Sequence, residues 1–318
     1  MLGVRREKKA EAGPPEYDLI IIGGGPAGLT AAVYAARKNM KTVIVADQLG
    51  GQPMVTWGIE NYMGFQYITG PELMEKFEEQ AVQFRIDQEV GQPVTKLELD
   101  GRMKKVTTAD GRVYSGRTVI IASGKRSRQL GIPGEKEYAG CGVSYCATCD
   151  GPLFRGEEVM VAGGGNSGMQ AALELAALCP RVHLVSLTEL SGDEILVDKV
   201  MAEERISKHI RWQPVRIGGN TCVESATIES VESSDRLELA VKAVFIEIGL
   251  EPNTSFAVNL LELNRQKEIV VDCEGRTGVE GVFAAGDVTQ VRDKQIVVAA
   301  GEGAKAALSA HEYLLGQR

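Results

Sequence analysis

The segment SYCATCDG, residues 144–151, carries the residue types best suited to chemistry. Cys146 and Cys149 form a CxxC pair, a spacing that brings two thiols close enough to close a small disulfide ring and lowers the pKa of one of them. Asp150 follows directly, and a carboxyl group beside a dithiol could transfer protons as thiolates form and leave. The same carboxyl group could also cap a helix. The pattern predicts a redox-active pair with an adjacent acid.

A zinc site is the main alternative for the CxxC pair. Structural zinc takes four ligands, but the sequence has no second CxxC, and its three histidines stand singly along the chain. We therefore predict no metal. The other four cysteines are predicted to be structural, with a resolving or regulatory thiol as the alternative for the one that lies five residues before the pair; they are Cys141, Cys179, Cys222 and Cys273.

Two copies of one pattern must position this pair. YDLIIIGGGPAG (17–28) and EVMVAGGGNSG (158–168) are apolar strands running into GxGxxG, and each is followed by a helix-like segment and a second strand. The first glycine precedes that second strand by 18 residues in both copies. Such glycines permit a tight turn and a close approach to a pyrophosphate at a helix N-terminus. Each copy predicts a dinucleotide-binding turn.

Two further markers extend this organisation. Asp47 ends the second strand of the first copy, where a carboxylate accepts hydrogen bonds from a ribose. GVFAAGDVTQ (281–290) reads as a strand and turn before a closing helix, as in the second half of a flavin domain. The predicted fold is α/β, with two doubly wound, Rossmann-like, three-layer nucleotide-binding domains, the second inserted in the first. We expect a flexible leader at 1–16, an FAD-binding domain at 17–128 and 252–318, and an inserted NAD(P)-binding-like domain at 129–251.

Composition excludes several classes of protein. The 318 residues carry a net charge of −8, which argues against a nucleic-acid partner. No run approaches the roughly 18 apolar residues of a membrane span, and the first residues lack the apolar segment of a secretory signal. We therefore expect a cytoplasmic protein.

Six motifs in order, IIGGGPAGL, GGQPM, IENYMGF, SYCATCDGPLF, GGGNSG and FAAGDV, resemble those of bacterial low-molecular-weight thioredoxin reductases. GPLFRG and GEGAKAALSA are also similar to the flavoprotein of alkyl hydroperoxide reductase. The resemblance covers the chain from Tyr17 onward. It implies a homodimeric FAD-dependent disulfide oxidoreductase whose domains alternate by rotation on a hinge. It also implies that Cys149 faces the flavin, Cys146 attacks the partner's disulfide and Asp150 supplies a proton.

The motifs and the resemblance together predict two sets of cofactor contacts. The predicted FAD contacts are Gly23, Gly25, Pro26, Ala27, Gly28, Asp47, Gly51, Gln52, Asn61, Gly124, Gly286, Asp287, Gln295 and Ile296. The second nucleotide site, which has features of a vestigial one, comprises Gly163, Gly165, Asn166, Ser167, Gly168 and Glu189. Because the chain carries about 16 residues before its first strand and one CxxC, we expect a separate thioredoxin or small glutaredoxin-like protein to accept the electrons.

The segment after the second strand of the second copy raises a question about the electron donor. Aligning RVHLVSL with KTVIVAD places Leu187 opposite Asp47, and Glu189 stands two residues later. The HRRxxxR motif with which thioredoxin reductases bind the 2′-phosphate of NADPH is absent. Residues 182–198 hold four acids and neither lysine nor arginine, so a 2′-phosphate lacks a guanidinium partner and NADPH is disfavoured.

Several interpretations of function follow from this departure. The first is a thioredoxin-disulfide reductase with an atypical donor, either NADH held through Glu189 or a ferredoxin-type carrier. NADPH held through unusual contacts stays open. A dithiol oxidase that passes electrons to oxygen and a non-enzymatic flavin and thiol redox sensor are the remaining alternatives.

Overall fold

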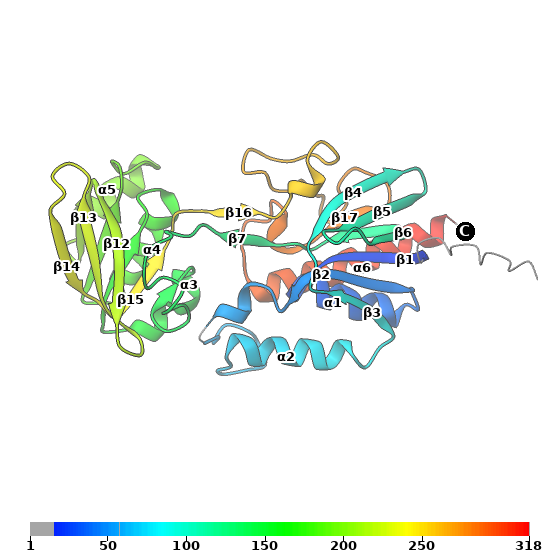
Figure 1. Cartoon of the computed structure of the whole chain (residues 1–318), viewed down its shortest axis with the longest axis horizontal. Helices are drawn as coiled ribbons and strands as arrows, with labels where there is room; N and C mark the ends of the chain where they lie inside the picture. The colour runs from blue at the N-terminus through cyan, green and yellow to red at the C-terminus, as the bar shows by residue number, and fades with distance from the viewer. Residues whose placement is uncertain (1–15, 57, 318) are drawn as a thin grey trace, which may run out of the picture. The chain divides into compact units, whose positions relative to one another are not determined.

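The computed structural model describes residues 16–56 and 58–317 (Figure 1). The expected leader therefore lies, apart from its last residue, outside the described residues. The chain divides into two compact units, with 1–51, 77–124 and 253–318 in unit 1 and 52–76 and 125–252 in unit 2. Residues 52–76 thus group with the second unit, whereas the sequence analysis assigned them to the first domain.

Unit 1 is built on a seven-stranded sheet in the order β3-β2-β1-β6-β5-β4, with β17 paired to β6. Its first strand, β1, is an almost continuous apolar run, as expected for a parallel strand that is buried on both faces. Strands β3, β2, β1, β6 and β17 run parallel, and β4, β5 and β6 are antiparallel. The strands are β1 (Glu16–Gly24), β2 (Thr42–Leu49), β3 (Ile86–Val90), β4 (Val94–Asp100), β5 (Met103–Thr108), β6 (Val113–Ile121) and β17 (Val282–Ala284).

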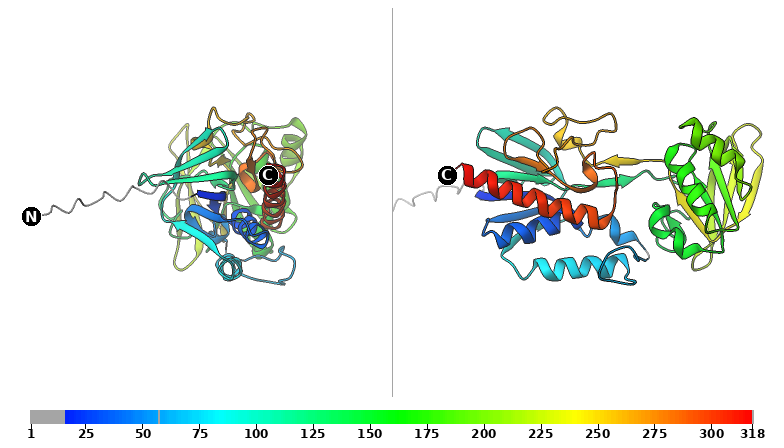
Figure 2. Two further views of the ribbon diagram at one scale, coloured as in Figure 1. Left: turned by 90° about the vertical axis from the view of Figure 1, so that its right-hand side faces the viewer. Right: turned by 180° about the vertical axis from the view of Figure 1, so that it is seen from behind.

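Helices α1 (Pro26–Arg37) and α6 (Ile296–Gly316) lie side by side against this sheet (Figure 2). Small residues allow the close approach, since a Cβ atom at Gly303 would lie 2.0 Å from the carbonyl oxygen of Ala27. A separate cluster of buried side chains joins Ile20 and Val43 of the sheet to Leu261. The remaining segments of regular structure outside 125–252 are α2 (Gly70–Ala81), η1 (Gln52–Val55), η3 (Ser255–Ala257) and η4 (Gly286–Val288).

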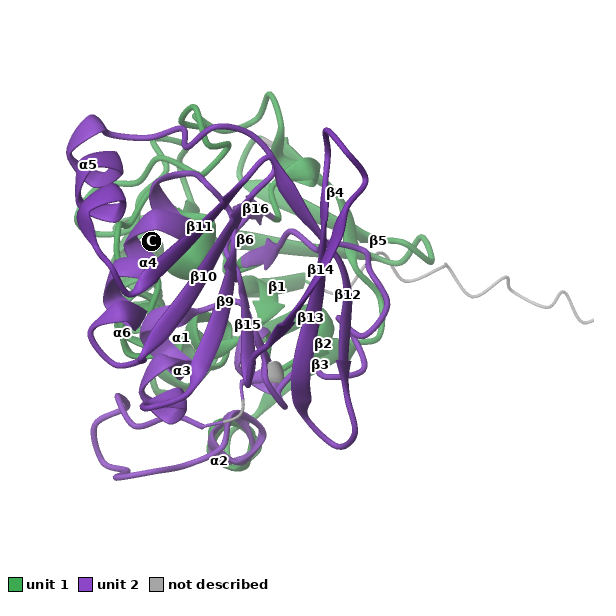
Figure 3. Cartoon of the chain, turned by 90° about the vertical axis from the view of Figure 1, so that its left-hand side faces the viewer, with its two compact units in different colours: residues 1–51, 77–124, 253–318 green, residues 52–76, 125–252 purple. Residues whose placement is uncertain are grey.

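Unit 2 contains a five-stranded parallel sheet in the order β11-β10-β9-β15-β8. Helices α4 and α5 cover one face, and the antiparallel sheet β12-β13-β14 covers the other (Figure 3). Alternate residues of β9 serve the two layers, because Val159 and Val161 pack with the helices and Met160 with the antiparallel sheet. The predicted fold class, two Rossmann-like domains with the second inserted in the first, is confirmed.

The chain passes between the units through an antiparallel pair of short strands, β7 and β16. The strands of unit 2 are β7 (Lys125–Ser127), β8 (Val143–Ser144), β9 (Glu158–Ala162), β10 (Arg181–Ser186), β11 (Ile206–Ile210), β12 (Trp212–Gly219), β13 (Val223–Ser230), β14 (Arg236–Ala240), β15 (Ala243–Ile246) and β16 (Leu250–Pro252). The helices within residues 125–252 are α3 (Ala147–Asp150), η2 (Gly151–Phe154), α4 (Asn166–Ala176) and α5 (Glu194–Ala202). No helix in the part of the chain that the structure describes is long and apolar enough to cross a membrane.

Two local features near cysteines differ from what their sequence suggests. EIVVDC (268–273) has the apolar, β-branched composition of a strand, but it forms only isolated bridges through Ile269. Cys222 lies in the turn between β12 and β13 and forms a disulfide with Cys141, with their Cα atoms 4.9 Å apart. These two cysteines are therefore paired with each other, while Cys179 and Cys273 are free.

Candidate active site and nucleotide sites

The structure joins Cys146 and Cys149 in a disulfide, with their Cα atoms 5.3 Å apart. We call residues 144–150 the redox turn. Cys146 has an extended backbone and precedes the short helix α3, and its Sγ accepts a hydrogen bond from the backbone N–H of Cys149 at 3.2 Å. The turn therefore places an amide donor on one sulfur of the pair.

Asp150 closes the redox turn and is buried, with 7% of its surface exposed. The Ser144 hydroxyl donates a hydrogen bond of 2.6 Å to Oδ2, whereas Oδ1 is buried and has no hydrogen-bond partner among the described residues. Burial raises the pKa of Asp150 to about 6, and the Ser144 hydrogen bond opposes this increase. The side chain makes no capping bond to η2, so the helix-cap interpretation is wrong. A carboxyl group with this pKa can both hold and release a proton near neutral pH.

The two GxGxxG turns have nearly the same geometry. Gly23 and Gly163 have φ angles of 110° and 139°, in the region that favours glycine. A Cβ atom at Gly28 would lie 2.0 Å from the Gly23 carbonyl oxygen, and one at Gly168 would lie 2.0 Å from that of Gly163. The third glycine of each motif is thus required so that the helix can pack against the turn.

Unit 1 contains most of the predicted FAD contacts. The turn at Gly25 opens α1, and Asp47 lies exposed near the carboxyl end of β2. A Cβ atom at Gly51 would lie 3.2 Å from the Cα of Gly25, so the two glycines leave space beside the helix N-terminus. This cradle and the exposed carboxylate fit the pyrophosphate and ribose of FAD.

The other predicted FAD contacts fall into two groups. The first group belongs to unit 1 and lies outside the glycine turn, either next to β7 or near α6. It comprises Gly124, Gly286, Asp287, Gln295 and Ile296. Gly286 has a φ of 77°, and its N–H donates a 3.0 Å hydrogen bond to the Glu302 carboxylate. Gln52 and Asn61 belong to unit 2 instead.

In the second nucleotide turn, the polar side chains have partners within unit 2. Asn166 accepts a hydrogen bond of 2.9 Å from the Asp193 N–H, and Ser167 donates one of 2.5 Å to Glu247. Glu247 follows β15 and was missed by the sequence analysis because it lies in no motif. The available signal was its position at the carboxyl end of a parallel strand, the edge at which such folds bind ligands.

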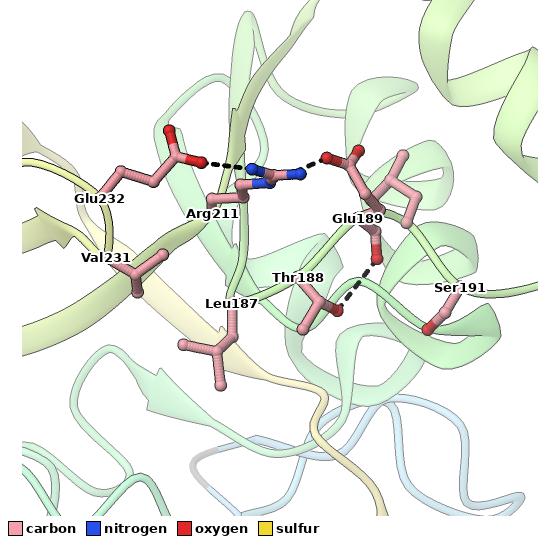
Figure 4. A pocket seen from close by; sticks show the side chains of 8 residues that line it. Leu187, Thr188, Glu189, Ser191, Arg211, Val231 and Glu232 are labelled. Atoms are coloured by element: carbon pink, nitrogen blue, oxygen red, sulfur yellow. Dashed lines mark hydrogen bonds and ion pairs between the residues drawn. The ribbon is translucent and has the colours of Figure 1, made fainter.

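A cavity of about 550 Å³ opens beyond the carboxyl end of β10 (Figure 4). Glu189 points into it and pairs with Arg211, whose Nε lies 3.0 Å from its Oε1, and the same guanidinium also pairs with Glu232. Two carboxylates and one guanidinium leave a formal charge of −1. The lining residues are Leu187, Thr188, Glu189, Leu190, Ser191, Arg211, Val231 and Glu232.

Arg211 is the second residue that the sequence analysis missed. The segment 182–198 holds no cation, yet the cavity beside it does. Ser186 of β10 pairs with Ile210 of β11, so Leu187 and Arg211 leave the sheet at the same edge. The strand order, which is not readable from the local charge, places the arginine there.

The comparisons with known proteins agree on one family. Residues 17–303 match the family described as pyridine nucleotide-disulphide oxidoreductase. The chain is 40% identical over 318 residues to a subunit of alkyl hydroperoxide reductase from Pseudomonas putida, covering 98% of this chain and 61% of that protein. It is 41% identical over 305 residues to a protein named NADH dehydrogenase from Ferdinandcohnia aciditolerans, covering 94% and 58%. The chain thus spans about 60% of the length of these curated relatives.

Among solved structures, the thioredoxin reductase of Streptococcus pyogenes matches with a TM-score of 0.90 and 38% identity, covering 95% of this chain and 99% of that one. The predicted resemblance to thioredoxin reductases and to the alkyl hydroperoxide reductase flavoprotein is therefore confirmed.

Proposed function

Because this chain belongs to the pyridine nucleotide-disulphide oxidoreductase family, we propose that it is a flavin-dependent disulfide reductase. In this proposal, electrons pass from NADH through FAD and the Cys146–Cys149 pair to a thioredoxin-like or peroxiredoxin-type acceptor. The observation that carries the proposal is the Cys146–Cys149 disulfide in one turn with the buried Asp150 carboxyl group. Bound FAD would supply two-electron transfer between nicotinamide and sulfur.

The chemistry of the redox turn balances with the residues that it holds. Reducing the disulfide breaks one S–S bond and requires two electrons and two protons. The Cys146 thiolate then attacks the partner's disulfide, forming a mixed disulfide and releasing a partner thiolate. Cys149 attacks Cys146 and restores the internal disulfide, so the partner leaves as a dithiol. Asp150, oriented by the Ser144 hydroxyl, supplies the proton that a departing thiolate needs.

The cavity after β10 supports NADH as the donor. Glu189 is a carboxylate at the edge where a dinucleotide fold binds the adenosine ribose, and ribose hydroxyls are donors that a carboxylate accepts. The single guanidinium of the cavity already pairs with two carboxylates. A relative named NADH dehydrogenase is consistent with this choice. The relatives named above give a ferredoxin donor no support.

NADPH is the second candidate donor, because the Arg211 guanidinium is a group that could pair with its 2′-phosphate. A 2′-phosphate, which carries nearly two negative charges, would have to replace Glu189 or Glu232 at the guanidinium. Both carboxylates are largely exposed, so each one that stays within about 4 Å of the phosphate would cost about 1 kcal/mol per unit of phosphate charge. This repulsion supports NADH over NADPH.

The acceptor and the assembly are inferred from the relatives. Alkyl hydroperoxide reductase and thioredoxin reductase relatives support a peroxiredoxin-type or thioredoxin-like acceptor and a homodimer. Unit 1 would hold FAD and unit 2 the nicotinamide nucleotide, with rotation about β7 and β16 between them. We infer that the protein works in the cytoplasm.

The proposal is tested by mixing the purified flavoprotein anaerobically with NADH, NADPH or photoreduced ferredoxin and following the flavin absorbance. Rapid loss of absorbance with NADH alone supports the proposal, and a faster loss with NADPH or ferredoxin overturns the donor assignment. Adding oxidised thioredoxin or peroxiredoxin and counting new thiols tests the acceptor. No reduction by any of the three donors would favour the dithiol oxidase or the sensor. Flavin that is instead reduced by a dithiol and reoxidised by oxygen would favour the oxidase.

A further inference from the structure

Glu247 connects the redox turn to the second glycine turn. Its backbone N–H donates to the Ala162 carbonyl at 2.8 Å and so extends the pairing of β15 with β9 by one residue. Its side chain then lies between α3 and α4. Oε1 accepts a 3.3 Å hydrogen bond from the Ala147 N–H, and Oε2 accepts a 2.5 Å hydrogen bond from the Ser167 hydroxyl.

The contacts of Glu247 suit an ionised carboxylate. Both oxygens accept hydrogen bonds, and a protonated carboxyl group would have to give up one acceptor position to its own O–H. Burial raises the pKa of Glu247, and the nearby Glu174 carboxylate raises it further, whereas the hydrogen bonds from Ser167 and Ala147 lower it. The carboxyl group is therefore held half-buried, and its two hydrogen bonds offset part of the cost of ionising it there.

The Glu247 carboxylate contacts the backbone of the redox turn next to Cys146. Ala147, whose amide Glu247 holds, directly follows Cys146 in the chain. The Cys146 Sγ takes its own amide hydrogen bond from Cys149, within the same turn. After the disulfide is reduced, a Cys146 thiolate and the Glu247 carboxylate would be like charges on one short turn, and a nearby like charge disfavours ionisation.

We propose that Glu247 is a positioning residue of the redox turn, whose carboxylate fixes the Ala147 amide and disfavours the Cys146 thiolate, so that the Cys146–Cys149 disulfide has a more negative reduction potential than it would have with a neutral side chain. A dithiol whose thiolate is stabilised is a poorer reductant, because its reduced form is favoured. Glu247 acts in the opposite direction and makes the pair a stronger reductant. The inference depends on the pair being redox-active and holds for any electron donor.

The test compares four forms of the flavoprotein: wild type, Glu247→Gln, Glu247→Asp and Ser167→Ala. Glutamine keeps an oxygen for the Ala147 amide but removes the charge. Aspartate keeps the charge, and Ser167→Ala keeps Glu247 itself while removing one of its hydrogen bonds. Each protein is equilibrated at pH 7 in glutathione buffers of graded potential, and the Cys146–Cys149 dithiol is trapped by alkylation and quantified in its peptide by mass spectrometry. The pH dependence of Cys146 alkylation is measured in a Cys149→Ser background.

We expect Glu247→Gln to shift the redox equilibrium toward the dithiol by about three- to tenfold, a tenfold shift corresponding to 29.6 mV. The midpoint for Cys146 alkylation should also move to lower pH, by at least the logarithm of that shift, because only the ionised fraction of the thiol changes the equilibrium. Glu247→Asp should stay near wild type in both measurements. Ser167→Ala removes a hydrogen bond that lowers the pKa of Glu247, so it should shift the equilibrium in the same direction as Glu247→Gln but by less. An unchanged potential in Glu247→Gln would overturn the proposal. An equal shift in Glu247→Asp would also overturn it, because packing rather than charge would then be responsible.

Discussion

The substitution Asp150→Asn tests the proton-transfer role of the redox turn, because it preserves shape and removes the titrating group. With a pKa of about 6, roughly one Asp150 side chain in ten is protonated at pH 7. A carboxyl group at the ordinary value of 3.8 would be protonated in roughly one molecule in 1,600. Burial thus increases the supply of the acid form by about 150-fold, within the range of about 10² to 10⁴ that general acid–base catalysis contributes.

The assay is the pH dependence of kcat/KM for reduction of a disulfide substrate. Asp150→Asn should lower kcat/KM by about 10² or more and should remove the titration near pH 6 from the profile. Ser144→Ala is the matched comparison. Because the Ser144 hydrogen bond lowers the pKa of Asp150, its loss should move that titration to higher pH while keeping the acid. If Asp150→Asn kept kcat/KM within about threefold and left the profile unchanged, the proton-transfer role would be refuted.

Three further predictions concern unit 2. Glu189→Ala should weaken NADH binding by about tenfold, which corresponds to the loss of roughly one charge-assisted hydrogen bond. Glu232→Gln should strengthen NADPH binding, because it releases the Arg211 guanidinium. Titration calorimetry that shows no change in either variant would contradict the assignment of the cavity. Cys141→Ser should lower the free energy of unfolding by about 2–4 kcal/mol, because the disulfide to Cys222 closes a loop with a sequence separation of 81, and urea denaturation with and without reductant would detect this. Burial lowers the pKa of His209 to about 4, so as the pH decreases the unfolded chain binds a proton at this residue before the folded chain does. The free energy of unfolding should therefore fall as the pH decreases from about 6.5 toward 4. A melting temperature that stays constant over this range would contradict the prediction.

The sequence was sufficient where structure depends on local geometry. The glycine turns at Gly23 and Gly163 could be predicted because a strand, a tight turn and a helix N-terminus constrain neighbouring residues together. The CxxC pair and its acid were readable for the same reason. The tight hydrogen bond from Ser144 was not foreseen, although it joins residues only six apart.

Contacts that depend on strand order could not be predicted. Arg211 reaches the cavity because β11 neighbours β10 in register, which no local pattern reports. Likewise, the Cys141–Cys222 disulfide depends on the β12–β13 turn lying beside residue 141, where the Val223 N–H donates to the Cys141 carbonyl at 3.0 Å. EIVVDC has the composition of a strand but lacks a neighbour along its length, so only isolated bridges at Ile269 form.

The central claim is that electrons from NADH reach a partner protein through the Cys146–Cys149 pair. The most direct measurement is an anaerobic single-turnover experiment in which NADH is mixed with the flavoprotein and oxidised thioredoxin or peroxiredoxin, while flavin absorbance and partner thiols are followed together. We predict that the wild-type protein gives two partner thiols per NADH oxidised. Cys149→Ser should reduce its flavin but stop at a mixed disulfide between Cys146 and the partner, with one partner thiol exposed and no free partner dithiol. Free partner dithiol released at the wild-type rate by Cys149→Ser, or partner thiols formed with NADPH in preference to NADH, would contradict the account.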